Sequence, residues 1–137
     1  MKPTVVAIVL LIVSVLGASL INNLVKRLVA RERPSPLGGI RQAGGYSFPS
    51  GHALGSLVFF GVLAYLVWHL TRRPLPSLLA VVGSGIVTAL VGYSRVVLRQ
   101  HHTGDVLSGY GLGAAWLVLV LRAFRGPLQA EGGGHGS

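Results

Sequence analysis

Long apolar runs dominate this sequence and restrict what it can fold into. Four of them lie at about residues 4–25, 53–70, 78–93 and 106–121. They are continuous rather than spread at amphipathic spacing, which points to lipid as the solvent. The last two are short for a full span, so their helices must extend into flanking polar residues. The runs predict an all-α, polytopic membrane bundle of about four transmembrane helices.

The composition agrees with a lipid environment. Only 11% of the 137 residues are charged and 51% are hydrophobic, whereas a soluble domain carries about 25% charged residues. The absence of cysteine excludes disulfides and thiolate metal sites. The net charge of +9 comes from short basic groups at the ends of the apolar runs. This placement favours an anionic substrate, anionic membrane lipids and topology signals as explanations, and we expect no nucleic-acid partner.

The length allows one domain, and we assign residues 1–126 to a transmembrane domain. Residues 127–137 are of low complexity and are expected to be a disordered tail or a cloning remnant, in which His135 is not a ligand. The N-terminus has two interpretations. Lys2 followed by an apolar core is typical of a signal peptide, but the run continues without a break into residues 20–34, which favours a retained helix.

Helix packing and orientation can also be predicted. Two glycine pairs, Gly51 with Gly55 and Gly109 with Gly113, have the spacing that lets helices approach closely in a bilayer. Four spans place both termini on one side of the membrane and the 34–49 connection on the other. Three cations on the loop side are set aside as possible ligand-binding residues. The terminal side then holds five basic residues, and the loop side holds four. The positive-inside rule then turns the loop side away from the cytoplasm.

The first polar cluster contains Lys26 and, seven residues later, Arg33 followed by Pro34. Seven residues are almost two helical turns, so the two cations are expected on one face of a helix that ends at or just before Pro34. A lysine point charge beside an arginine fork suits an oxyanion. Basic side chains that snorkel at a membrane boundary would give the same pattern.

The second cluster is Pro49-Ser50-Gly51-His52, at the expected start of a helix. Free backbone N–H groups and the positive end of the helix dipole make such a start an anion site. Ser50 adds a hydroxyl, Gly51 allows close approach to the backbone, and His52 is a possible proton donor. An ordinary serine cap beside an interfacial histidine is the competing interpretation.

The third cluster is Ser94-Arg95, then His101, then Asp105. His101 and Asp105 are four residues apart and can touch on one helical turn. An aspartate that accepts from one ring nitrogen fixes the tautomer and leaves the other nitrogen as a nucleophile. A helix-capping aspartate with a bystander histidine is the alternative.

Taken together, the three clusters resemble the type 2 phosphatidic acid phosphatase superfamily, and specifically its membrane lipid phosphatase branch. The family signature is Lys, six residues, Arg-Pro; then Pro-Ser-Gly-His; then Ser-Arg, five residues, His, three residues, Asp. All eleven positions occur here in order, between residues 26 and 105. Membrane members usually have about six helices, so this chain is expected to be a short form or a fragment whose missing helices would precede residue 1. The family also often places an aromatic residue and a proline after the nucleophilic histidine, whereas this chain has His102-Thr103.

The resemblance implies a metal-independent membrane phosphatase that hydrolyses a lipid phosphate or polyprenyl diphosphate through a phosphohistidine, with no cofactor. It implies that His101 is the nucleophile, because only this histidine has the family spacing to both Arg95 and Asp105. Asp105 would orient His101, and His52 would protonate the leaving oxygen and then activate water. The implied phosphate-binding residues are Lys26, Arg33, Ser50, Gly51 and Arg95.

Several matters stay open at this stage. Phosphatidic acid, phosphatidylglycerol phosphate and a polyprenyl diphosphate all fit as substrates. A truncated non-catalytic relative or scaffold is an alternative, and a vanadate-dependent haloperoxidase is disfavoured because those relatives are soluble. The chain is expected in the plasma (inner) membrane of a prokaryote, with the active site facing away from the cytoplasm and with homo-oligomer formation possible.

Overall fold

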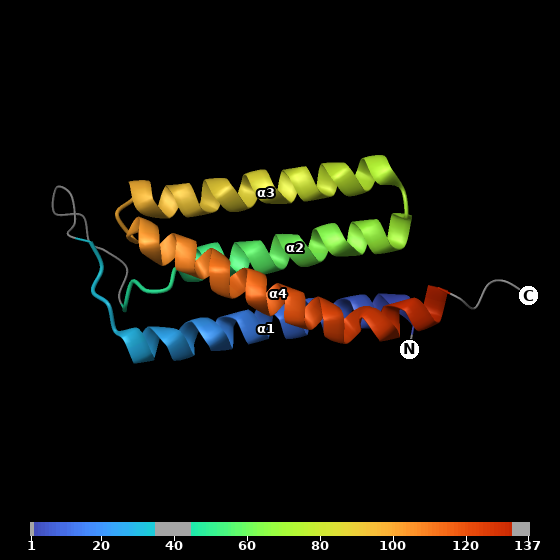
Figure 1. The fold of residues 1–137 in the computed structure, drawn as a ribbon, viewed down its shortest axis with the longest axis horizontal. Coiled ribbons are helices and arrows are strands. Elements are labelled where there is room, and N and C mark those ends of the chain that lie inside the picture. Colours follow the sequence, from blue (N-terminus) through green and yellow to red (C-terminus); the bar gives the residue numbers. More distant parts are fainter. Residues whose placement is uncertain (1, 35–44, 133–137) are drawn as a thin grey trace, which may run out of the picture.

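The protein is described by a computed structural model that covers residues 2–34 and 45–132, and these residues form a bundle of four α-helices (Figure 1). The helices are α1 (Pro3–Val29), α2 (Gly51–Thr71), α3 (Pro74–Val97) and α4 (Thr103–Gly132). Each is long and apolar enough to cross a membrane. The expected all-α fold and its four long helices are confirmed, and both short apolar runs do extend into flanking residues.

Helix α2 occupies the centre of the bundle and contacts each of the other three helices. Helices α1 and α4 pack together on one part of its surface, whereas α3 packs on α2 and has few contacts with α4. Figure 1 shows that the connections from α1 to α2 and from α3 to α4 lie at one end, and that both termini and the α2–α3 turn lie at the other. The polar clusters of the sequence therefore meet at a single end of the bundle.

Two glycines of α4 allow it to approach α2 closely. A Cβ atom at Gly109 would lie 2.6 Å from the backbone oxygen of Ser50, and one at Gly113 would lie 3.1 Å from that of Leu54. The close approach predicted for this pair is confirmed. In the other pair, Gly51 packs against the side chain of Asn22 on α1, whereas a Cβ at Gly55 would meet no atom within 4 Å.

The boundary expected at residue 127 is wrong, because α4 continues through Pro127 to Gly132. Tertiary packing explains the extension. The side chain of Leu128 is only 2% exposed and lies in a core with Val6, Leu10, Val62 and Val120. Burial of this leucine holds the last turns of α4 in place despite the proline. Residues 133–137, which include His135, and residues 35–44 of the expected long connection lie outside the described residues.

We expect Gly109→Ala to destabilise the bundle by about 1–3 kcal/mol, because the added methyl group would overlap the backbone of α2. Gly111→Ala is the matched control, since a Cβ at Gly111 meets no atom within 4 Å. Thermal unfolding of both variants in detergent measures the difference. Equal melting temperatures for the two variants would show that the close approach of α2 and α4 does not limit stability.

Candidate active site

A cavity of about 500 Å³ opens between α1 and α2 at the end of the bundle that carries the polar clusters. Five of the sequence-predicted site residues line it, namely Lys26, Arg33, Gly51, His52 and His101. The same cavity extends along the two helices to Val15, Ala18 and Phe59. Val15 lies eleven residues before Lys26 on α1, which is about 16 Å of helix rise. The cavity therefore has a charged end and an apolar end that reaches into the membrane-spanning region.

The two cations of the first cluster reach the cavity from different kinds of backbone. Helix α1 ends at Val29, and Ala30 adopts a left-handed conformation with φ 48°, so its N–H donates to the Lys26 oxygen. The expectation that Lys26 and Arg33 share a helical face is therefore wrong. Arg33 lies in a non-helical segment beyond the end of α1, as its position before Pro34 favours.

Backbone carbonyl groups hold both cations at the cavity. The Lys26 Nζ donates to the oxygens of Tyr46, at 3.0 Å, and Pro49, at 2.7 Å. The Arg33 Nη1 donates to the Gln100 oxygen at 2.7 Å. Burial lowers the pKa of the Arg33 guanidinium from its ordinary value, but arginine stays charged in proteins. These contacts fix two positive charges beside His101.

Ser50 and Gly51 differ in how they meet the cavity. Ser50 is fully buried and caps α2, because its hydroxyl accepts from the Ala53 N–H at 3.3 Å. Its own N–H donates to the Asp105 backbone oxygen at 2.9 Å, and it is not among the cavity-lining residues. Gly51 does line the cavity, where the Asn22 amide packs over it. The first N–H groups of α2, at Gly51 and His52, have no partner within the helix.

His52 and Arg95 complete the set of expected residues. The His52 side chain lines the cavity at the start of α2, where the charges of Arg95, Arg33 and Lys26 all act on its ring. Arg95 does not line the cavity. Its Nε donates to the Ser94 hydroxyl at 3.4 Å, and its backbone oxygen accepts from the N–H groups of Gln100 and His101. Arg95 thus supports the turn that carries His101.

His101 is fixed by the backbone of the connection between α1 and α2. Its Nδ1 lies 2.6 Å from the Ser47 oxygen, and its Nε2 lies 3.5 Å from Arg33 Nη1. Because a carbonyl can only accept, Nδ1 carries the proton in this contact and Nε2 keeps its lone pair. Burial is the main reason that the pKa of His101 is lowered to about 4, and the charges of Arg33 and Lys26 act in the same direction. The ring is therefore neutral at pH 7.

Asp105 does not hold His101 in the way the sequence suggested. The expectation of a contact on one helical turn is wrong because α4 begins at Thr103, so His101 precedes the helix. The Asp105 carboxylate instead accepts from the His102 N–H at 2.7 Å, lies 3.1 Å from the His102 Nδ1, and pairs with Arg31 Nη1 at 3.1 Å. It thereby caps α4 in the manner of a capping box and shapes the turn beside His101.

Sequence reasoning missed three contributors to the site. Ser47 supplies the carbonyl that fixes His101, and Arg31 neutralises Asp105. Asn22 packs over Gly51, and its buried side-chain oxygen has no hydrogen-bond partner among the described residues. No pattern could have revealed Ser47, because its main-chain oxygen is the group involved. The signal for Asn22 was its polar amide inside an apolar run.

The comparisons with known proteins agree with this geometry. The family model of the PAP2 superfamily matches residues 7–127. A phosphatidylglycerophosphatase B of Bacillus subtilis is 35% identical over 113 residues, which cover 81% of this chain and 55% of that protein. An uncharacterized 22.5 kDa protein in the cps region of Klebsiella pneumoniae is 36% identical over 85 residues, covering 61% of this chain and 39% of that protein.

A solved structure is also similar. It is the crystal structure of the first transmembrane PAP2 type phosphatidylglycerolphosphate phosphatase from Bacillus subtilis, with a TM-score of 0.76 and 31% identity. The match covers 87% of this chain and 59% of that one. The likeness, together with the four apolar helices, identifies this chain as an integral membrane protein. The chain spans little more than half the length of these Bacillus relatives.

The geometry makes a prediction about the pH dependence of His101. We expect its ring to titrate near pH 4 in an NMR titration, and Arg33→Gln to move the midpoint upward because a positive charge is removed. Since the folded state keeps the ring neutral, its contribution to stability is complete above about pH 6.5 and is lost as the pH falls towards 4. Arg27→Gln, at an exposed position near the end of α1, is the control. A midpoint at or above 6.5 in the unaltered protein would contradict the prediction.

Proposed function

Because this chain belongs to the PAP2 superfamily, we propose that it is a membrane phosphatase that removes the terminal phosphate of phosphatidylglycerol phosphate. The observation that carries the proposal is the two-ended cavity. Lys26, Arg33, His52 and His101 form its charged end, and the side chains of Val15, Ala18 and Phe59 lead from there along α1 and α2. A phosphate joined to a lipid tail has the same division into charged and apolar parts.

The charged end suits phosphoryl transfer, in which positioning and charge stabilisation supply most of the catalysis. Lys26 and Arg33 would exchange carbonyl partners for phosphate oxygens, and the N–H groups of Gly51 and His52 would donate to the same anion at the helix start. Because Arg95 lies outside the cavity, we propose that it supports the site through its positive charge and by holding the turn that carries His101. Ser50 acts through its cap on α2.

The neutral His101 is the proposed nucleophile through Nε2. Its lone pair attacks phosphorus, the bond from phosphorus to the lipid oxygen breaks, and His52 gives a proton to that oxygen. In the second step, His52 takes a proton from water, which attacks phosphorus and releases phosphate and His101. Ser47 holds the Nδ1 proton throughout, and Asp105 positions the turn without touching the ring. The charge compensation comes from side chains of the protein.

The relatives support the choice among lipid phosphates. Both the similar curated protein and the similar solved structure, each from Bacillus subtilis, are named as phosphatases of phosphatidylglycerol phosphate. Phosphatidic acid and polyprenyl diphosphates share the charged group and the apolar tail, so they are the comparison substrates. The proposed site would face away from the cytoplasm across the plasma membrane of a bacterium. This orientation rests on the positive-inside rule with Lys26, Arg33 and Arg95 set aside as part of the site, which leaves four basic residues on the active-site side and five on the other.

We expect phosphate release from phosphatidylglycerol phosphate by the purified protein in detergent with a chelator present. His101→Ala should lower the rate by about three orders of magnitude or more. His102→Ala is the matched control, because His102 does not line the cavity and its ring hydrogen-bonds to Asp105 instead, and the rate should stay within about tenfold of the parent. Radiolabelled substrate should yield an acid-labile phosphoenzyme in the parent and none in His101→Ala. If the parent and His101→Ala release phosphate equally, the chain is a non-catalytic relative.

The apolar end of the cavity can be tested separately. Val15→Trp should raise KM for long-chain phosphatidylglycerol phosphate by about tenfold, because the indole would occupy the space for the tail. Val13→Trp is the control, since Val13 is exposed on α1 but does not line the cavity. Hydrolysis of p-nitrophenyl phosphate, which has no tail, should be equal in both variants. A loss of activity towards both substrates would indicate damage to the charged end instead.

A further inference from the structure

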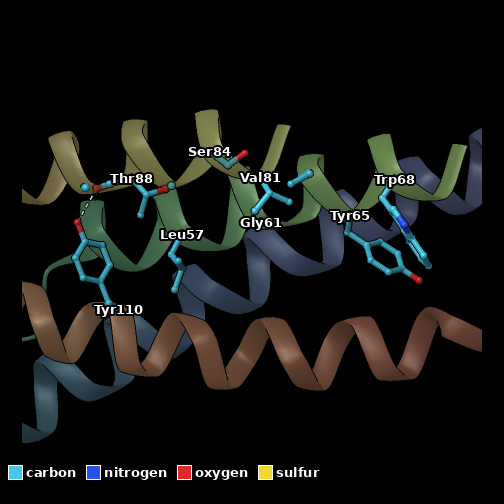
Figure 2. Close-up of a pocket in the computed structure, with 11 residues that line it drawn as sticks. Leu57, Gly61, Tyr65, Trp68, Val81, Ser84, Thr88 and Tyr110 are labelled. Carbon is cyan, nitrogen blue, oxygen red and sulfur yellow. Dashed lines mark hydrogen bonds between the residues drawn. The ribbon is translucent and has the colours of Figure 1, made fainter. Parts of the chain in front are cut away.

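A second cavity lies between α2, α3 and α4 and takes no part in the proposed reaction (Figure 2). This cavity, which we call the α3–α4 groove, has a volume of about 570 Å³. The residues that line it are Leu57, Gly61, Ala64, Tyr65, Trp68, Val81, Ser84, Gly85, Thr88, Ala89 and Tyr110. Its hydroxyl groups are largely engaged with the backbone. Tyr110 donates to the Thr88 oxygen at 2.6 Å, and Ser84 donates to the Phe60 oxygen at 3.0 Å. The groove therefore presents an apolar surface.

A basic pocket of about 220 Å³ adjoins the groove at the end of the bundle opposite the active site. It is lined by Tyr65, Trp68, His69, Leu121, Arg122, Arg125 and Gln129. Tyr65 and Trp68 line both cavities, and Figure 2 shows them at the end of the groove away from Tyr110. An apolar channel within the membrane thus leads to a positively charged pocket at its edge.

Two cations of this pocket have no recorded partner. Arg122 and Arg125 are exposed, and neither guanidinium forms a hydrogen bond or ion pair with the side chains that the structure describes. Arg72 is already engaged, because it lies 4.8 Å from the centre of the Trp68 ring and its Nη2 is 3.3 Å from His69 Nδ1. Because Arg122 and Arg125 are three residues apart on α4, they face the pocket together.

We propose that the α3–α4 groove and the basic pocket together bind one anionic phospholipid, with its phosphate between Arg122 and Arg125 and an acyl chain in the groove. Charge complementarity selects this occupant. Two guanidiniums match an anionic headgroup, and no described carboxylate lies in the pocket to pair with the ammonium group of a zwitterionic lipid. Trp68 and Tyr65 lie between tail and headgroup, where aromatic side chains occur at membrane interfaces.

A lipid in this position would lie along α2 and α3, which supply all but one of the residues that line the groove. Helix α3 packs on α2, and near the active site its backbone accepts one hydrogen bond from Tyr110 of α4. Away from Tyr110, the described residues that line the groove belong to α2 and α3 (Figure 2). An acyl chain there would fill the space between them. We therefore expect the bound lipid to stabilise the bundle against thermal unfolding.

Native mass spectrometry from mixed micelles of phosphatidylserine and phosphatidylcholine tests the headgroup. These phosphodiesters are not substrates for the proposed reaction, so the result is independent of catalysis. The parent should retain one phosphatidylserine with a preference of about tenfold or more over phosphatidylcholine. Arg122→Gln with Arg125→Gln should abolish the preference. Lys2→Gln with Arg73→Gln, which removes two exposed charges outside the pocket, should keep it. Equal loss in both double variants would mean a general surface attraction and would overturn the proposal.

A second pair of variants tests the tail. Gly85 lines the groove and Gly83 does not, and a Cβ at either position meets no atom within 4 Å. Gly85→Leu should lower phosphatidylserine retention by about tenfold and reduce the rise in melting temperature on lipid addition, because its side chain occupies the space for the acyl chain. Gly83→Leu should behave like the parent. If the two variants retain the lipid equally, the groove holds no tail and the proposal fails.

Discussion

A buried carboxylate determines how the active-site end of this bundle is assembled. Asp105 is fully buried, and a charge at that depth is tolerated only when it is paired and hydrogen-bonded. Arg31 comes to it from the segment after α1, and His102 binds it from the turn before α4. The Asp105 backbone oxygen accepts from Ser50 at the start of α2. One residue therefore brings together three segments that are distant in the sequence.

The same assembly explains how His101 can be neutral among cations. The main-chain carbonyl of Ser47 that holds the ring nitrogen Nδ1 raises the pKa of His101, but less than burial lowers it. Burial and the charge of Arg33 then keep the pKa of His101 low. Anchoring of Lys26 and Arg33 by carbonyl oxygens sets those charges before any substrate arrives, which is the preorganisation that electrostatic catalysis requires.

Lipid as the solvent accounts for the open surfaces of the bundle. Helices in a bilayer gain no hydrophobic advantage from packing against each other, so close contact depends on small residues such as Gly109 and Gly113. Helix α3 approaches α4 closely at Gly92, where a Cβ atom would overlap Tyr110 and Val106, but it has few contacts with α4 in all, and the groove beside it is apolar. A groove of this kind is stable beside lipid, whereas in water its exposure would be costly.

Much of the fold and part of the site could be predicted from the sequence. Apolar run lengths determined the number and type of helices, because a bilayer admits few alternatives. The resemblance to the family signature named Lys26, Arg33, Gly51, His52 and His101, all of which line one cavity, and also Ser50, Arg95 and Asp105, which do not line it. Local rules failed at helix ends. They placed Arg33 on α1 and His101 on α4, and they ended the ordered chain before Leu128.

Only the tertiary structure decided those ends and the partners of the reactive groups. The packing of Leu128 is a consequence of contacts with other helices, which local propensity does not contain. Ala30 also gives no local signal for the left-handed conformation that ends α1. Likewise, the partner of His101 is a backbone oxygen, and every residue has one, so no sequence pattern distinguishes Ser47. The sequence by itself determined which residues we propose for the chemistry and that lipid is the solvent of the helices. The tertiary structure decided which atoms hold them, because hydrogen bonds between distant segments form only after the chain has packed.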